Sequence, residues 1–75
     1  MVTQKRIQKI DEEIQYYLEE AKECEQRQEK ALQEDDPVAA TRCLYSLRRA
    51  ETMAYRLQAI KKAWLEGTEP PFAYP

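Results

Sequence analysis

The four residues Glu34-Asp35-Asp36-Pro37 separate two long segments of helical pattern and decide the fold of this chain. Proline lacks a backbone N–H and suits the first position of a helix, where that N–H would have no partner. It also disfavours helical geometry in the residue before it, and aspartate is a good N-cap. We therefore predict that one helix ends before this point, that a second begins at Pro37, and that a tight turn at residues 35–36 reverses the chain.

Apolar residues recur with a seven-residue period on both sides of this turn. In the first segment, heptad positions a and d hold Ile7, Ile10, Ile14, Tyr17, Ala21, Cys24, Gln28 and Ala31. In the second, they hold Ala40, Cys43, Leu47, Ala50, Ala54, Leu57, Lys61 and Trp64. Such a seam is typical of helices that pack along their length as in a coiled coil. We predict one helix from about residue 3 to 34 and another from about 37 to 66, ended by Gly67.

The two seams match when the chain is folded at the turn. Pairing residues whose numbers sum to 71 places each a residue opposite a d residue, as antiparallel packing requires. The pairs are small near the turn, such as Ala31 with Ala40, and bulky at the other end, where Ile7 meets Trp64. We therefore predict an all-α, antiparallel two-helix hairpin over residues 1–67.

Residues 68–75 contain three prolines, which favour an extended, polyproline-like tail. This tail also contains Phe72 and Tyr74. These aromatic side chains could dock in a groove of a partner, fold back over Trp64, or belong to a disordered end. The sequence leaves the three possibilities open.

A hairpin of this size leaves apolar side chains beside its seam that two helices alone do not cover. Leu18, Leu32 and Leu44 fall on one flank at position e, whereas Met53 and Ile60 fall on the other at position g. Adjacent tyrosines combine an apolar ring with a polar tip, which suits interfaces. The predicted partner interface comprises Leu18, Leu32, Leu44, Tyr45, Met53, Tyr55 and Ile60. A second copy could cover it as a homodimeric four-helix bundle, or another helical protein could; an isolated monomer is the remaining possibility.

Charge is distributed unevenly along the chain. Residues 1–36 carry 6 basic and 11 acidic side chains, and residues 37–75 carry 6 basic and 3 acidic ones. Arg42, Arg49 and Arg56 recur every seven residues and could form a face for nucleic acid or an acidic partner. Pairing with glutamates of the first helix, such as Glu12 and Glu19, is the simpler explanation. A net charge of −2 also argues against a dedicated nucleic-acid binder.

The composition contains little that could support catalysis. The chain has no histidine, one glycine, and two cysteines, Cys24 and Cys43, without metal-ligand spacing. We expect no enzymatic activity, no metal or cofactor, and no small-molecule substrate. The sequence lacks both an apolar run of about 20 residues and the apolar stretch of a signal peptide, so we expect a cytoplasmic protein without membrane contact.

The second helix has the pattern Leu47-x-x-Ala50-Glu51-x-x-Ala54-x-x-Leu57-x-x-Ile60 and follows a long first helix and a turn at Asp35-Asp36-Pro37. Over residues 5–66 this layout resembles the small E-type co-chaperones of type III secretion needle subunits. Those proteins are short helical hairpins that bind a repeat-like chaperone and, with it, keep the needle protein soluble before export. The resemblance implies a chaperone-like adaptor that acts through protein–protein contacts.

Overall fold

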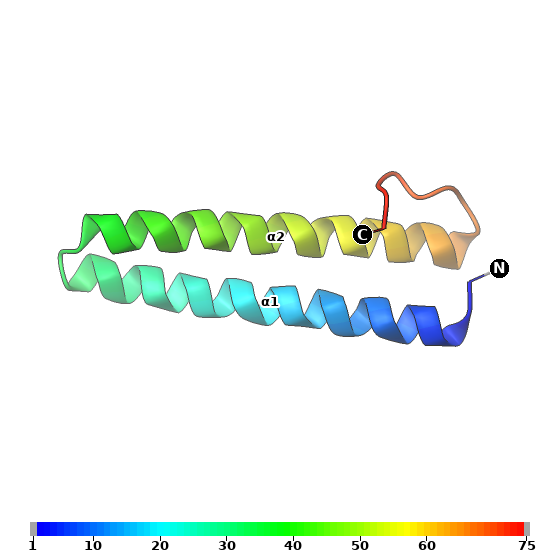
Figure 1. Ribbon diagram of the computed structural model, residues 1–75, viewed down its shortest axis with the longest axis horizontal. Helices are drawn as coiled ribbons and strands as arrows, with labels where there is room; N and C mark the ends of the chain where they lie inside the picture. The colour runs from blue at the N-terminus through cyan, green and yellow to red at the C-terminus, as the bar shows by residue number, and fades with distance from the viewer. Residues whose placement is uncertain (1, 75) are drawn as a thin grey trace.

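The computed structural model describes residues 2–74, which form two long helices packed side by side in opposite directions (Figure 1). Helix α1 spans Gln4–Gln33 and helix α2 spans Pro37–Glu66, each with 30 residues. The predicted all-α antiparallel hairpin is confirmed. It is elongated, with dimensions of 51 × 19 × 16 Å. A membrane-spanning segment would need a longer apolar run than either helix offers within residues 2–74.

A hydrogen-bonded cap ends α1 and forms the turn. The Asp36 N–H donates to the Ala31 carbonyl at 2.9 Å, and the Asp35 N–H donates to the Leu32 carbonyl at 3.2 Å. This Schellman pattern requires a left-handed residue at Asp35, whose φ is 55°, although glycine is usual at this position. The Asp36 carboxylate then accepts the Ala39 N–H at 3.1 Å and begins α2. The turn therefore depends on backbone groups and two aspartates.

The outer ends of the helices are also capped. The Thr3 hydroxyl accepts the Arg6 N–H at 3.3 Å at the start of α1. At the end of α2, Gly67 has a φ of 70°, and the Thr68 N–H donates to the Ala63 carbonyl at 2.9 Å. The same Schellman motif thus ends both helices, with glycine in the left-handed position of the second only.

The seam between the helices differs between the two ends of the hairpin. We call residues 18–53 the turn half, and residues 2–17 together with 54–74 the open half. The buried side chains of the turn half are all small: Ala21, Cys24, Ala31, Ala40 and Ala50. Those of the open half include the large residues Ile10, Ile14, Leu57 and Ile60, which form one cluster. The main hydrophobic core therefore lies at the open half, where the Asp11–Lys61 ion pair of 2.5 Å also joins the helices.

The tail beyond Gly67 folds back along α2 toward the middle of the hairpin (Figure 1). The Tyr74 ring lies 5.2 Å from the Trp64 ring, centroid to centroid, and the Tyr74 hydroxyl donates to a carboxylate oxygen of Glu13 at 2.9 Å. Phe72 and Tyr74 both pack against the large-residue cluster. Of the possibilities left open by the sequence, the structure shows the fold-back over Trp64.

The position of Ile60 differs from our expectation. We placed it on an uncovered flank with Met53, but its side chain is only 1% exposed. Phe72 and Tyr74 of the tail, together with Tyr17 and Trp64, pack against the cluster to which Ile60 belongs. The chain itself therefore fills part of the surface that we had assigned to a partner, and Ile60 is a core residue.

Candidate interaction surface

The hairpin has two long flanks, one on each side of the seam. Position e of both helices borders the first, where Asp11 and Gln58 line a shallow groove of about 380 Å³. Position g of both helices borders the second, where Glu20 and Met53 line a groove of about 320 Å³. We call the first the leucine flank, because position e also holds Leu18, Leu32, Leu44 and Leu65. We call the second the tail flank, because Tyr74 of the tail donates a hydrogen bond to Glu13 at position g.

Four leucines of the turn half form the apolar part of the leucine flank. Leu18 is 42% exposed and Leu32 is 63% exposed, whereas Leu44 and Leu47 are half-buried. We call these four residues the leucine face. Leu47 is a member that the sequence pattern missed, since its seam position predicted a core residue. The residue opposite it in the register is the small Cys24, so the two helices leave Leu47 partly uncovered.

The leucine face ends where the open half begins. There the same flank carries the Asp11–Lys61 ion pair and the polar side chain of Gln58. Leu65 is 65% exposed but lies beyond these polar groups, near the end of α2. The uncovered apolar surface of this flank is therefore concentrated in the turn half.

The other predicted interface residues do not join the leucine face. Met53 is half-buried and lines the groove on the tail flank. Tyr55 is contacted by the tail, with its ring 6.3 Å from that of Phe72. Tyr45 is 70% exposed and occupies the outermost heptad position of α2. Of the seven predicted residues, only the three position-e leucines share one surface.

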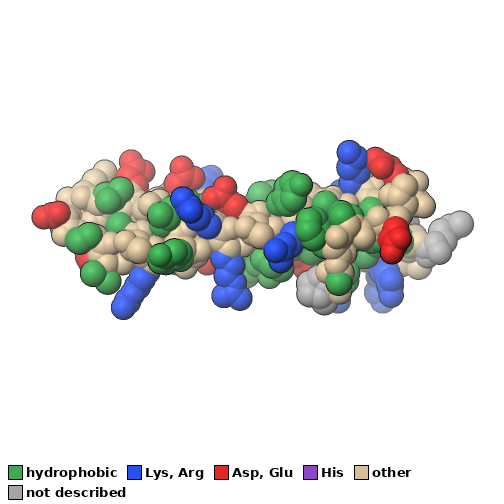
Figure 2. Space-filling view, turned by 90° about the horizontal axis from the view of Figure 1, so that it is seen from above, with side chains coloured by type: hydrophobic (Ala, Val, Ile, Leu, Met, Phe, Trp, Pro, Cys, Tyr) green, Lys and Arg blue, Asp and Glu red, His purple; other side chains and the backbone are tan. Residues whose placement is uncertain are grey.

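The three arginines predicted to form a charged face are all exposed on α2. The Arg56 guanidinium lies 5.6 Å from the centre of the Phe72 ring, a cation–π contact with the tail. The ion pairs found within residues 2–74 do not include Arg42, Arg49 or Arg56. Figure 2 shows basic side chains spaced along this side of the molecule, with hydrophobic groups between them. The tail therefore engages one end of the arginine row.

Both thiols are free and lie at the seam of the turn half. Cys24 is buried and Cys43 is half-buried. Burial raises the pKa of the Cys24 thiol, and the nearby Glu20 carboxylate raises it further. Because the thiolate is the reactive form, these effects oppose nucleophilic chemistry at Cys24. This side chain serves as a small packing residue between the helices.

A hollow of about 700 Å³ lies at the start of α1. Side chains of Thr3 and the first three turns of α1 line it, so it is an open helix face rather than a cleft between elements. No group of three or more His, Cys, Asp or Glu side chains in residues 2–74 is arranged to hold a metal ion. The leucine face is the feature of the described surface with the most distinct chemistry.

Comparison of the chain with known protein families, curated protein sequences and solved structures finds no match. The resemblance to needle co-chaperones therefore stays a prediction. The features of the molecule that bear on function are the leucine face, its charged surroundings and the contrast between the two halves of the hairpin.

Proposed function

We propose that this chain is a non-enzymatic protein–protein interaction module, a small helical-hairpin adaptor that binds its partner through the leucine face. One observation carries the proposal. The open half covers its cluster of large apolar residues with the chain's own tail, whereas the turn half leaves four leucines on one flank exposed or only half-buried. Covering a leucine side chain contributes roughly 1.5–3 kcal/mol, so a partner that covers several of them gains substantial affinity.

The charge around the leucine face supports a protein partner over nucleic acid. Acidic residues predominate on α1, and an extended phosphate backbone requires a continuous basic surface. On α2, Arg56 at the end of the arginine row contacts Phe72 of the tail. The needle co-chaperone role is a specific case of the proposed function, in which a repeat-like chaperone would bind the leucine face.

Site-specific photo-crosslinking tests this function in cells that produce the protein. A photo-crosslinking amino acid in place of Leu32 should yield protein adducts, because that side chain lies in the proposed interface. The same amino acid in place of Glu12, an exposed residue on the outer side of α1, is the matched control and should yield few. Nuclease-sensitive adducts at position 32, or equal yields at both positions, would contradict the proposal.

A further inference from the structure

We infer that the partner of the leucine face is a second copy of this chain, packed so that α1 of each copy lies on α2 of the other. This inference rests on the proposed function and names the partner of the same surface. The product would be a four-helix bundle in the turn half, with the two open halves side by side at one end. Three observations lead to it: the tail flank is partly closed, the chain has excess surface, and the charges beside the leucine face are complementary.

The tail limits the number of faces available for self-association. The Tyr74 hydroxyl donates a hydrogen bond to Glu13 at position g, and Phe72 and Tyr74 pack against the cluster that contains Ile60, at position g of α2. The leucine flank is then the longer of the two uncovered faces. A single self-complementary face produces a closed dimer, whereas two different faces would allow open chains of subunits. The fold-back of the tail therefore favours a two-fold dimer.

The exposed area of the chain matches what a dimer of this kind would cover. Its accessible surface is 6062 Å², whereas a compact folded chain of 8.9 kDa exposes about 4,800 Å². Its radius of gyration is 15.5 Å, against about 11 Å for a compact chain of this length. The excess surface exceeds the roughly 800 Å² per partner of a standard stable interface. One hairpin therefore has enough spare surface to supply half of such an interface.

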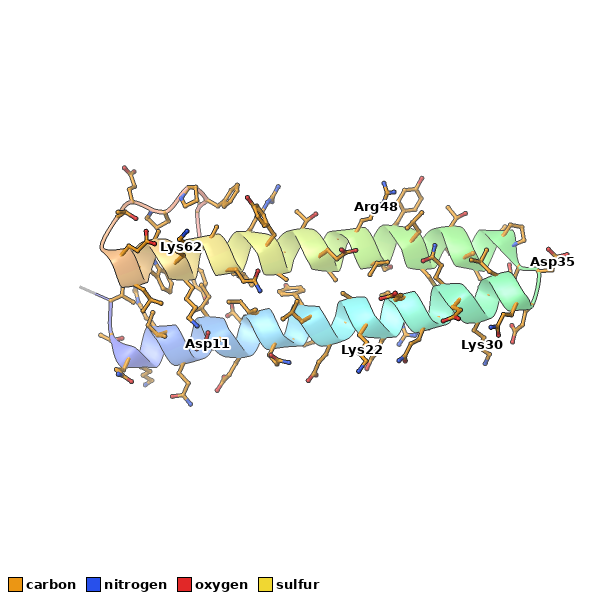
Figure 3. All side chains as sticks on the ribbon, turned by 180° about the vertical axis from the view of Figure 1, so that it is seen from behind. Asp11, Lys22, Lys30, Asp35, Arg48 and Lys62 are labelled. Atoms are coloured by element: carbon orange, nitrogen blue, oxygen red, sulfur yellow. The ribbon has the colours of Figure 1, made fainter. Side chains whose placement is uncertain are left out.

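The charges beside the leucine face match those of a second copy. On α1, Lys22 lies at position b beside it, and Glu25 lies at position e between Leu18 and Leu32; on α2, Arg48 lies at position b and Glu51 follows Leu44 at position e. All four are exposed, and none takes part in the ion pairs found within residues 2–74. In Figure 3, Lys22 and Arg48 extend from their helices away from the seam. These charges are available to an opposing subunit.

The register of the hairpin aligns these charges when α1 lies on α2 of the second copy. A two-fold axis parallel to the helices places residues whose numbers sum to about 71 at the same height. Measured along the helix axis, Glu25 then lies within about 3 Å of Arg48 of the second copy. Lys22 lies within the same distance of Glu51 of the second copy. The inverted packing would set α1 on α1. Residues 11–29 carry eight acidic and two basic side chains, so that packing brings like charges together.

Light scattering of the purified full-length chain across concentration tests the dimer. We expect twice the chain mass for the wild type and the monomer mass for the double variant Leu18→Glu/Leu32→Glu. Both leucines are exposed in the hairpin, so circular dichroism should show unchanged helix content. Leu65→Glu is the matched control, since Leu65 is equally exposed on the same flank but lies outside the leucine face, and it should stay dimeric. A monomeric wild type, or a dimer that the double variant leaves intact, would overturn the inference.

Charge reversal tests the orientation of the two copies. Arg48→Glu should weaken dimerisation about 3- to 10-fold, because two symmetric contacts become repulsive. Adding Glu25→Arg to the same chain should restore the affinity, since each exchanged charge again meets its opposite. Failure of the second change to rescue the first would overturn the α1-on-α2 arrangement.

The two proposals fail in different ways. A monomeric chain in solution whose position 32 still crosslinks to a different protein in cells would overturn the dimer and leave the interaction module standing. If position 32 crosslinks to no protein at all, both are wrong. Adducts of twice the chain mass at position 32 would support both.

Discussion

The two halves of the hairpin share one heptad pattern but differ in how their apolar side chains are covered. In the open half, large side chains such as Ile10, Leu57 and Ile60 form a cluster that the tail covers with two aromatic rings. In the turn half, the buried side chains are alanines and one cysteine, and the leucines lie at the edge of the seam. The open half is therefore a small core, and the turn half is an unfinished one.

The difference shows that side-chain volume, rather than the heptad period, decides whether a helical pair is self-sufficient. Small seam residues allow the helices to approach closely but bury little apolar area per layer. Leucines beside such a seam protrude past the partner helix instead of inserting between residues. The folding free energy should therefore come mainly from the open half, and binding affinity from the turn half.

The largest expected effect is loss of a core side chain in the open half. Ile60→Ala should lower the free energy of unfolding by about 2–5 kcal/mol, because Ile60 is 1% exposed and its removal leaves a cavity. Leu65→Ala, which truncates a 65% exposed side chain five residues further along α2, should cost less than about 0.5 kcal/mol. Urea unfolding followed by circular dichroism measures both. A similar loss of unfolding free energy in the two variants would contradict the distinction between a covered and an uncovered flank.

Removal of the aromatic rings from the tail should have the next largest effect. Phe72→Ala combined with Tyr74→Ala should cost about 2 kcal/mol, because both rings cover the cluster of the open half. Trp64 is the only tryptophan in the chain and contacts Tyr74, so its fluorescence should shift to the red. Leu32→Ala in the turn half, measured at a concentration where the chain is monomeric, is the control and should change neither property. An unshifted Trp64 emission in the double variant would mean that the tail does not cover this end in solution.

A smaller effect of opposite sign is expected at the turn. Asp35→Gly should raise the free energy of unfolding by about 0.5–1 kcal/mol, because glycine adopts the left-handed conformation of this cap without strain. Glu34→Gly is the control: Glu34 has a φ of −86°, so it should give no gain. Thermal unfolding of the three proteins would show the difference as a higher midpoint for Asp35→Gly alone. A lower midpoint would indicate that Asp35 contributes through its side chain.

The smallest expected effect is a pH dependence of the tail contact. Burial, followed by the hydrogen bond to Glu13, raises the pKa of Tyr74 above its ordinary value of 10.0. A raised folded-state pKa means that this contribution to stability is fully present below pH 10 and is lost as the pH rises through the higher folded-state value. As the pH rises above 10, the free energy of unfolding of the wild type should therefore fall more than that of Tyr74→Phe, by less than about 1 kcal/mol. Parallel curves for the two proteins would show that ionisation of the Tyr74 hydroxyl does not affect stability.

The sequence by itself determined the turn, the two helices and their register. Pro37, Asp36 and Gly67 act on the backbone of their immediate neighbours, and the heptad period follows from helix geometry, so these features can be read locally. The antiparallel pairing also follows, because a turn of two residues leaves the helices no other way to bury a continuous seam.

Only the tertiary structure decided which apolar residues remain uncovered. Tyr74 reaches Glu13, 61 positions earlier in the chain, and its ring packs against the cluster in which Ile60, a predicted interface residue, is buried. The exposure of Leu47 likewise depends on the small size of the residues across the seam. Both outcomes follow from the volume and fit of side chains that are distant in sequence. A periodic pattern specifies the direction in which a side chain points, but not what covers it.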